Sequence, residues 1–143
     1  MSYRGESFRL KQITLLSLLF LVSGILIELY LLGHYEDRSQ LIPVLITGAS
    51  LILVIVVSFR KTVFTLGLFK AALILAGLSG VYGTYLHLQA NFEFEQDMTP
   101  TAGTLELLTK SLSGALPALA PGSMIVLAMI GYLYILILQN QSQ

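Results

Sequence analysis

The sequence of 143 residues contains no cysteine and no tryptophan. Without cysteine, the chain has no disulfides, iron–sulfur clusters, thiol nucleophiles or thiolate metal sites. Charged residues make up only 11% of the chain, against roughly a quarter in soluble domains. Eight basic and eight acidic residues give a net charge of zero, and no basic block with interleaved aromatic residues occurs. Nucleic acid is therefore not an expected partner.

Hydrophobic residues, by contrast, make up 55% of the chain and gather in four long segments. A membrane-spanning helix needs about 20 mostly apolar residues to cross a hydrocarbon core of ~30 Å. We predict spans at residues 13–32, 41–59, 71–90 and 116–138. The predicted fold is an all-α integral membrane protein, with the four spans packed into one small bundle that forms a single domain, residues 1–143.

The positions of lysine and arginine predict the orientation of the spans. Only Arg38 and Lys110 lie on one side of the predicted membrane. The basic residues on the other side are Arg4, Arg9, Lys11, Arg60, Lys61 and Lys70. Because cytoplasmic connections carry the excess of lysine and arginine, we expect both termini in the cytoplasm of a multi-pass protein of the bacterial inner (plasma) membrane. The first segment is too long for a secretory signal and lacks a small-residue cleavage site.

Two connections carry patterns of their own. Residues 60–70 have cationic ends and an apolar middle, which indicates an interfacial helix or an early start of a tilted third span. The long outer connection, residues 91–115, breaks at Thr99, Pro100 and Gly103. Leucines then recur every three or four residues with polar residues between them, which predicts an amphipathic helix on the outer surface before the last span.

Pro117 and Pro121 lie at the start of the last predicted span. Proline removes a backbone donor and clashes with the preceding turn, so we predict a helix kink at Pro117, and Pro121 suits the first turn of the last helix. A re-entrant segment over residues 114–123 is the alternative, because broken backbone occurs at membrane depth where protein buries it or where it lines water.

Two stripes of small residues are predicted helix-packing faces, because small residues let helix backbones approach closely in lipid. Each stripe follows intervals of three and four residues and ends in an ionisable residue, Glu28 in the first span and His87 in the third. The predicted packing residues are Ser17, Gly24, Ala72, Ala76, Gly80 and Gly83.

Glu28 and His87 lie at similar predicted depths. At about 1.5 Å per residue, Glu28 lies roughly 8 Å and His87 roughly 10 Å outward of the middle of its span. An unpaired carboxylate at membrane depth costs about 2.5 kcal/mol or more. We therefore hypothesise that Glu28 and His87 form a buried polar pair in the outer half of the bundle.

Evidence for a metal site or an active site is weak. His34, His87 and Glu93 are nitrogen and oxygen donors near the predicted outer surface, but none follows the His-x-x-x-His or His-Glu-x-x-His spacing of zinc sites. A solvated acidic surface is the favoured interpretation. No nucleophile with an adjacent base, phosphate-binding glycine loop or dinucleotide fingerprint occurs, so we predict no catalytic residue and no cofactor and favour a protein that is not an enzyme.

Four spans with a carboxylate in the first resemble the small multidrug resistance transporters, in which such a carboxylate exchanges protons for cationic substrates. The resemblance covers the number of spans and Glu28. The chain departs from that family in its greater length, its missing tryptophan, the off-centre position of the acid and the connection at residues 91–115. These departures leave membership of the family unassigned.

Two functional hypotheses follow. The first is a scaffold or accessory subunit of a membrane complex, which contacts the lipid bilayer and either self-associates or binds another membrane protein. The alternative is a proton- or cation-coupled transporter or channel subunit that uses Glu28 and His87.

Overall fold

The computed structural model describes residues 3–140, with side chains from residue 5 onward, and this part of the chain forms five helices. The helices are α1 (Tyr3–Leu31), α2 (Arg38–Phe59), α3 (Val63–Met98), α4 (Thr104–Leu112) and α5 (Gly122–Asn140). All except α4 are long and apolar enough to cross a membrane. The predicted fold class is confirmed: four candidate membrane helices pack together, and a short helix precedes the last of them.

Local sequence signals set the ends of α1 and α2. After α1, Gly33 adopts a φ of 67°, a left-handed conformation that glycine reaches without steric cost and that reverses the chain. The Tyr30 and Tyr35 rings stack across this turn with centroids 5.7 Å apart. Asp37 then caps α2, and its backbone N–H donates to Gln40 Oε1 at 3.2 Å.

The third helix is longer than predicted at both ends. Thr62 caps its start by accepting a hydrogen bond from the Thr65 N–H at 3.1 Å. The connection after α2 is therefore only three residues, and residues 60–70 follow the second sequence-based alternative, an early start of the span. At about 1.5 Å per residue, the 36 residues of α3 extend about 54 Å, well beyond a ~30 Å hydrocarbon core. The predicted outer connection begins after Met98 rather than at residue 91.

The last helix begins at Gly122 instead of residue 116. Residues 113–121, which we call the proline loop, form successive turns, with the Ala120 N–H donating to Pro117 O at 3.1 Å. The predicted kink at Pro117 is therefore wrong, because Pro117 lies in this loop and not inside a helix. Pro121 directly precedes α5, close to its predicted place, because a residue without an N–H is tolerated where a helix starts.

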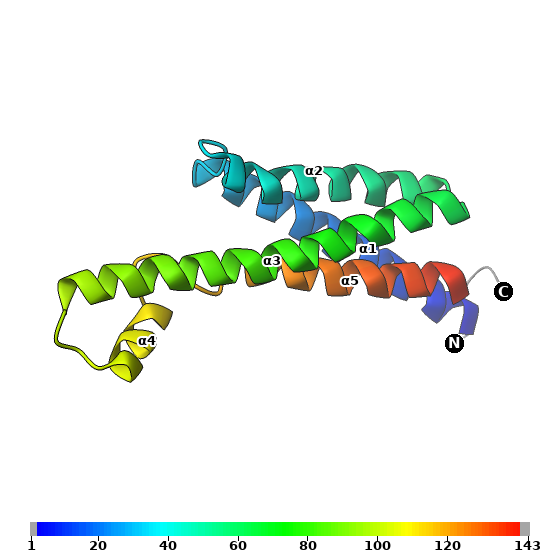
Figure 1. Cartoon of the computed structure of the whole chain (residues 1–143). Helices are drawn as coiled ribbons and strands as arrows, with labels where there is room; N and C mark the ends of the chain where they lie inside the picture. Colours follow the sequence, from blue (N-terminus) through cyan, green and yellow to red (C-terminus); the bar gives the residue numbers. More distant parts are fainter. Residues whose placement is uncertain (1–2, 141–143) are drawn as a thin grey trace.

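In the bundle, α3 packs against α5, α2 and α4, whereas α1 packs against α5 and α2 (Figure 1). Helices α1 and α3 do not pack against each other within the described chain. The most deeply buried apolar side chains are Leu18 and Val22 of α1, Val54 and Val57 of α2, Phe69 and Ala76 of α3, and Leu127, Tyr134 and Leu138 of α5. The start of α1 and the end of α5 lie at the same end of the bundle (Figure 1).

A few polar contacts join helices inside this apolar bundle. Thr47 of α2 lies 3.1 Å from Met124 Sδ of α5, and Ser58 lies 3.2 Å from the Tyr134 hydroxyl. The Thr47 and Ser58 hydroxyls also contact a carbonyl one turn earlier in their own helix. In lipid, such hydrogen bonds replace those that water would offer and help fix the order of the helices.

Candidate functional site

One face of α3 holds the best-defined polar site of the molecule. Gly80, Gly83, His87 and Asn91 follow one another by three or four residues, so they lie on one side of the helix. This face packs against α5 in its first part and against the proline loop in its second part. The arrangement brings the end of α3, the proline loop and α4 together at one end of the molecule (Figure 1).

Glycines allow the proline loop to approach α3 closely. A Cβ atom at Gly80 would lie 2.8 Å from the backbone oxygen of Pro121, and one at Gly83 would lie 2.9 Å from Pro121 Cβ. Both distances are shorter than van der Waals contact, so larger side chains would push the loop away. Along the same helix Ala72, Ala76 and Gly80 are buried and Gly83 is half-buried. The structure thus places the predicted small-residue stripe of α3 at a helix interface.

His87 contacts the proline loop rather than an acidic residue. Its Nδ1 lies 3.1 Å from Pro117 O. A carbonyl oxygen only accepts hydrogen bonds, so His87 carries a proton on Nδ1 in this arrangement. The His34 ring, from the turn after α1, lies beside it with centroids 6.3 Å apart. His34 Nδ1 is buried and has no hydrogen-bond partner within the described chain.

Asn91 ties α3 to two other segments. Its side chain is 2% exposed, and its Nδ2 donates to Ser111 O at 2.9 Å and to Leu116 O at 2.7 Å. The Leu116 N–H donates in return to Asn91 Oδ1 at 3.0 Å. A Cβ at Gly114 would lie 2.5 Å from Asn91 Cγ, so the loop folds tightly over the amide. One side chain thereby holds the end of α4 and the proline loop on α3.

Asn91 is not among the site residues predicted from the sequence. The signal was present, because Asn91 follows His87 by four residues and continues the stripe of Gly80 and Gly83. The sequence pattern predicts the outer connection to begin at Asn91, and only the continued helix makes this residue part of the face. A polar amide near the end of an apolar stripe satisfies the backbone of whatever segment covers it.

The structure does not bring Glu28 and His87 together. Glu28 is exposed on α1, and its side chain makes no hydrogen bond or ion pair within the described chain; α1 does not pack on α3. Similar depth places two residues at one level of a bundle, but it does not decide which helices are neighbours. Here α5 packs against both α1 and α3, and His87 contacts Pro117 instead.

The two predicted packing residues of α1, Ser17 and Gly24, face away from the bundle. Ser17 and Gly24 are exposed, and no atom of the described chain lies within 4 Å of a Cβ built on Gly24. Helix α1 instead buries an adjacent side, which carries Thr14, Leu18, Val22 and Ile25. Branched side chains on that side fill the space between α1, α2 and α5. Ser17 and Gly24 are therefore left exposed by the described part of the chain.

The three weak metal candidates do not form one site. His34 and His87 are adjacent, but Glu93 is exposed and accepts a hydrogen bond from Gln89 at 2.9 Å. Within residues 3–140 no three histidine, aspartate or glutamate side chains lie together as metal ligands would. The geometry therefore supplies no set of donors for a metal ion.

Charged groups lie at the two ends of the bundle. On α4, Lys110 Nζ lies 2.9 Å from Glu106 Oε1, and this hydrogen bond raises the pKa of Lys110. At the opposite end, burial and the positive charge of Lys11 lower the pKa of Lys61. Two ammonium groups close together indicate a positive local potential where α1 meets the connection between α2 and α3.

Comparisons of the chain with models of protein families, with curated proteins and with solved structures found no match. The four candidate membrane helices make it a small multi-span membrane protein. The resemblance to the small multidrug resistance transporters rests on the number of spans and on Glu28 alone.

Proposed function

We propose that this protein is an accessory or scaffolding subunit that binds a larger membrane protein through the exposed stripe of α1. The observation that carries the proposal is the outward position of Ser17, Gly24 and Glu28 on one face of a candidate membrane helix. Phe20, which is 83% exposed, lies on the same face. The bundle leaves this face uncovered although its pattern is typical of helix contacts.

The chemistry of the stripe favours a protein partner over lipid alone. Small residues bring helix backbones close together, and in lipid this close packing and polar contacts replace the hydrophobic effect. Glu28 lies in the last turn of α1, and a carboxylate facing hydrocarbon is costly unless another group hydrogen-bonds to it. A partner helix that covers Ser17 and Gly24 would bring donors within reach of Glu28.

The arrangement of α4 and the proline loop also supports a scaffold. Asn91 holds α4 on α3 through one hydrogen bond and the proline loop through two more, which favours a single arrangement of these segments. On α4, Leu107 and Ser111 are buried, whereas Leu105, Leu108 and Leu112 are exposed. We place this apolar face of α4 on the membrane surface, as its amphipathic pattern predicts.

The test is affinity purification of the tagged full-length chain in mild detergent, followed by native mass measurement. A photo-crosslinking residue at position 20 should form a covalent product with a second, larger membrane protein. Gly24→Leu should reduce both the mass of the complex and the crosslink. Gly67→Leu is the matched control, because Gly67 is also exposed with no atom within 4 Å of its Cβ position.

Two results would overturn the proposal. One is a monomer that forms no crosslink from position 20. The other is a homo-oligomer that moves protons or cations in liposomes and loses that activity with Glu28→Gln, which would favour the transporter hypothesis instead.

A further inference from the structure

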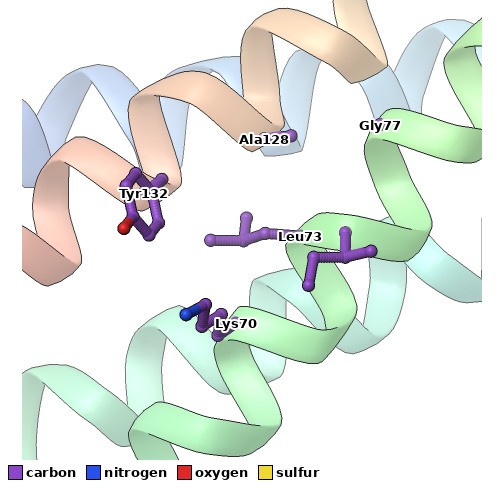
Figure 2. Close-up of a pocket in the computed structure, with 6 residues that line it drawn as sticks. Lys70, Leu73, Gly77, Ala128 and Tyr132 are labelled. Carbon is purple, nitrogen blue, oxygen red and sulfur yellow. The ribbon is translucent and has the colours of Figure 1, made fainter.

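A groove lies between α3 and α5 on the surface of the bundle (Figure 2). Its volume is about 280 Å³. The lining residues are Lys70, Leu73, Ile74, Gly77, Ala128 and Tyr132. Apart from the Lys70 ammonium and the Tyr132 hydroxyl, these side chains are apolar, so the groove suits a hydrocarbon chain.

Small residues make the groove. Gly77 and Ala128 lie together at one end of it (Figure 2), and a Cβ at Gly77 would lie 3.6 Å from Ala128 Cβ, which is ordinary contact. Larger side chains at either position would fill the space. On α3, Lys70, Leu73, Ile74 and Gly77 follow helical spacing, so the groove runs along the helix for about 10 Å.

Lys70 lies at the other end of the groove. Its Nζ is 5.8 Å from the centre of the Tyr132 ring, a distance typical of a cation–π contact (Figure 2). Lys70 is exposed, and no carboxylate of the described chain forms an ion pair with it. The ring holds the ammonium over the groove without neutralising its charge.

The depth of Lys70 matches that of lipid headgroups. Between Lys70 and Glu93, α3 carries no lysine, arginine, aspartate or glutamate. At about 1.5 Å per residue this stretch measures roughly 33 Å, close to the ~30 Å of a hydrocarbon core. Lys70 therefore lies at one membrane interface, and the groove descends from it into the hydrocarbon region.

We propose that this groove binds an anionic phospholipid. The lipid phosphate contacts the Lys70 ammonium, and one acyl chain lies against Leu73, Ile74, Gly77 and Ala128. The charge of Lys70 selects an anionic headgroup over a zwitterionic one, because basic side chains between membrane helices at an interface attract such lipids. This site is separate from the α1 stripe and does not depend on a protein partner.

Quenching by brominated lipids tests the proposal. The chain has no tryptophan, so Tyr132→Trp in the full-length protein gives a single tryptophan, whose selectively excited fluorescence reports on the groove. The protein is reconstituted with phosphatidylglycerol or phosphatidylcholine that carries bromine on its acyl chains. Quenching should show about a fivefold preference for phosphatidylglycerol, as expected for about 1 kcal/mol from one basic residue near the membrane surface.

Variants separate the site from general charge attraction. Adding Lys70→Gln should abolish the preference, and adding Ala128→Leu should reduce quenching by both lipids because it fills the groove. Lys61→Gln removes a charge from the connection after α2 and should leave the preference unchanged. Equal quenching by the two lipids in the reporter protein, or equal loss of preference with Lys61→Gln and Lys70→Gln, would overturn the proposal.

Discussion

Two stripes of small residues, alike in sequence, have different surroundings in the structure. On α3, a Cβ at Gly80 or Gly83 would collide with Pro121. On α1, Gly24 and Ser17 are exposed, and a Cβ at Gly24 would meet no atom within 4 Å. Spacing by three and four residues predicts both faces equally well. Only the neighbours of each helix distinguish them.

The difference shows what a small-residue stripe means in a membrane helix. It marks a face on which another backbone can come close, but it does not say whether that backbone belongs to the same chain. The α3 stripe is covered by α5 and by the proline loop. The α1 stripe is the one left for a partner, and substitutions on the two faces should therefore behave differently.

The largest change in the free energy of unfolding is expected from a substitution at Asn91, where the α3 stripe ends. Asn91→Leu keeps a similar volume but leaves the Leu116 N–H and the carbonyls of Ser111 and Leu116 without their partner. Each buried unsatisfied group costs about 1–3 kcal/mol, so we expect a loss of at least about 3 kcal/mol in the free energy of unfolding. Unfolding in detergent measures this loss. Gln89→Leu, on an exposed side of the same helix, should change little, and an equal loss from both variants would contradict the role of Asn91.

The next effect concerns contact within the α3 stripe. Gly80→Ala places a methyl group 2.8 Å from Pro121 O and should lower the free energy of unfolding by about 1–3 kcal/mol. Gly77→Ala is the control, because its methyl group would meet only Ala128 at 3.6 Å. Both variants gain the same helix propensity, so the difference between their unfolding midpoints isolates the steric contact. A Gly80→Ala protein as stable as Gly77→Ala would show that the proline loop moves freely.

A smaller effect on the isolated chain is expected from the α1 stripe. Gly24→Leu should change the free energy of unfolding of the purified protein by no more than about 0.5 kcal/mol, because surface substitutions away from special features do little. The same variant should reduce co-purification with the partner. A destabilisation as large as that of Gly80→Ala would mean that the α1 face is covered within the chain. The two stripes would then not differ in their surroundings.

The smallest change in stability is expected from Lys11 and Lys61, which lie where α1 passes the connection after α2. Burial and the charge of Lys11 lower the pKa of Lys61, so the folded protein binds fewer protons there than the unfolded chain as the pH approaches 10.5. Stability linked to Lys61 therefore rises with pH in the range below that value. Lys11→Gln should raise the pKa of Lys61 and flatten this rise. NMR of isotopically methylated lysines measures the pKa, and an unchanged value would show that Lys11 lies too far away to act.

Some outcomes followed directly from the sequence pattern, and others did not. Four apolar segments predicted four candidate membrane helices, and all four are present. The leucine spacing after Gly103 predicted the short helix α4. The predicted ends of the helices were less accurate. For example, α3 continues past residue 90 to Met98. Exposed turns at the end of a helix carry little hydrophobic signal, so periodicity does not fix where they stop.

The polar contacts were the least predictable part. Depth along each helix suggested Glu28 as the partner of His87, but His87 contacts Pro117. The partners of Asn91 carried no signal, because they are backbone groups of Ser111 and Leu116. Any residue supplies such backbone groups, so the sequence does not mark them. Their position depends on how the proline loop folds.

By itself, the sequence determined that the chain is an all-helical membrane protein, because long uncharged segments satisfy their backbone hydrogen bonds only as helices in lipid. It also determined which residues of each helix share a face, because the helix has a fixed period. The tertiary structure alone decided that α5 lies against both α1 and α3 and that the α1 stripe faces outward. The order of helices around a bundle arises from close packing between distant segments, and the repeat of a single helix contains no information about it.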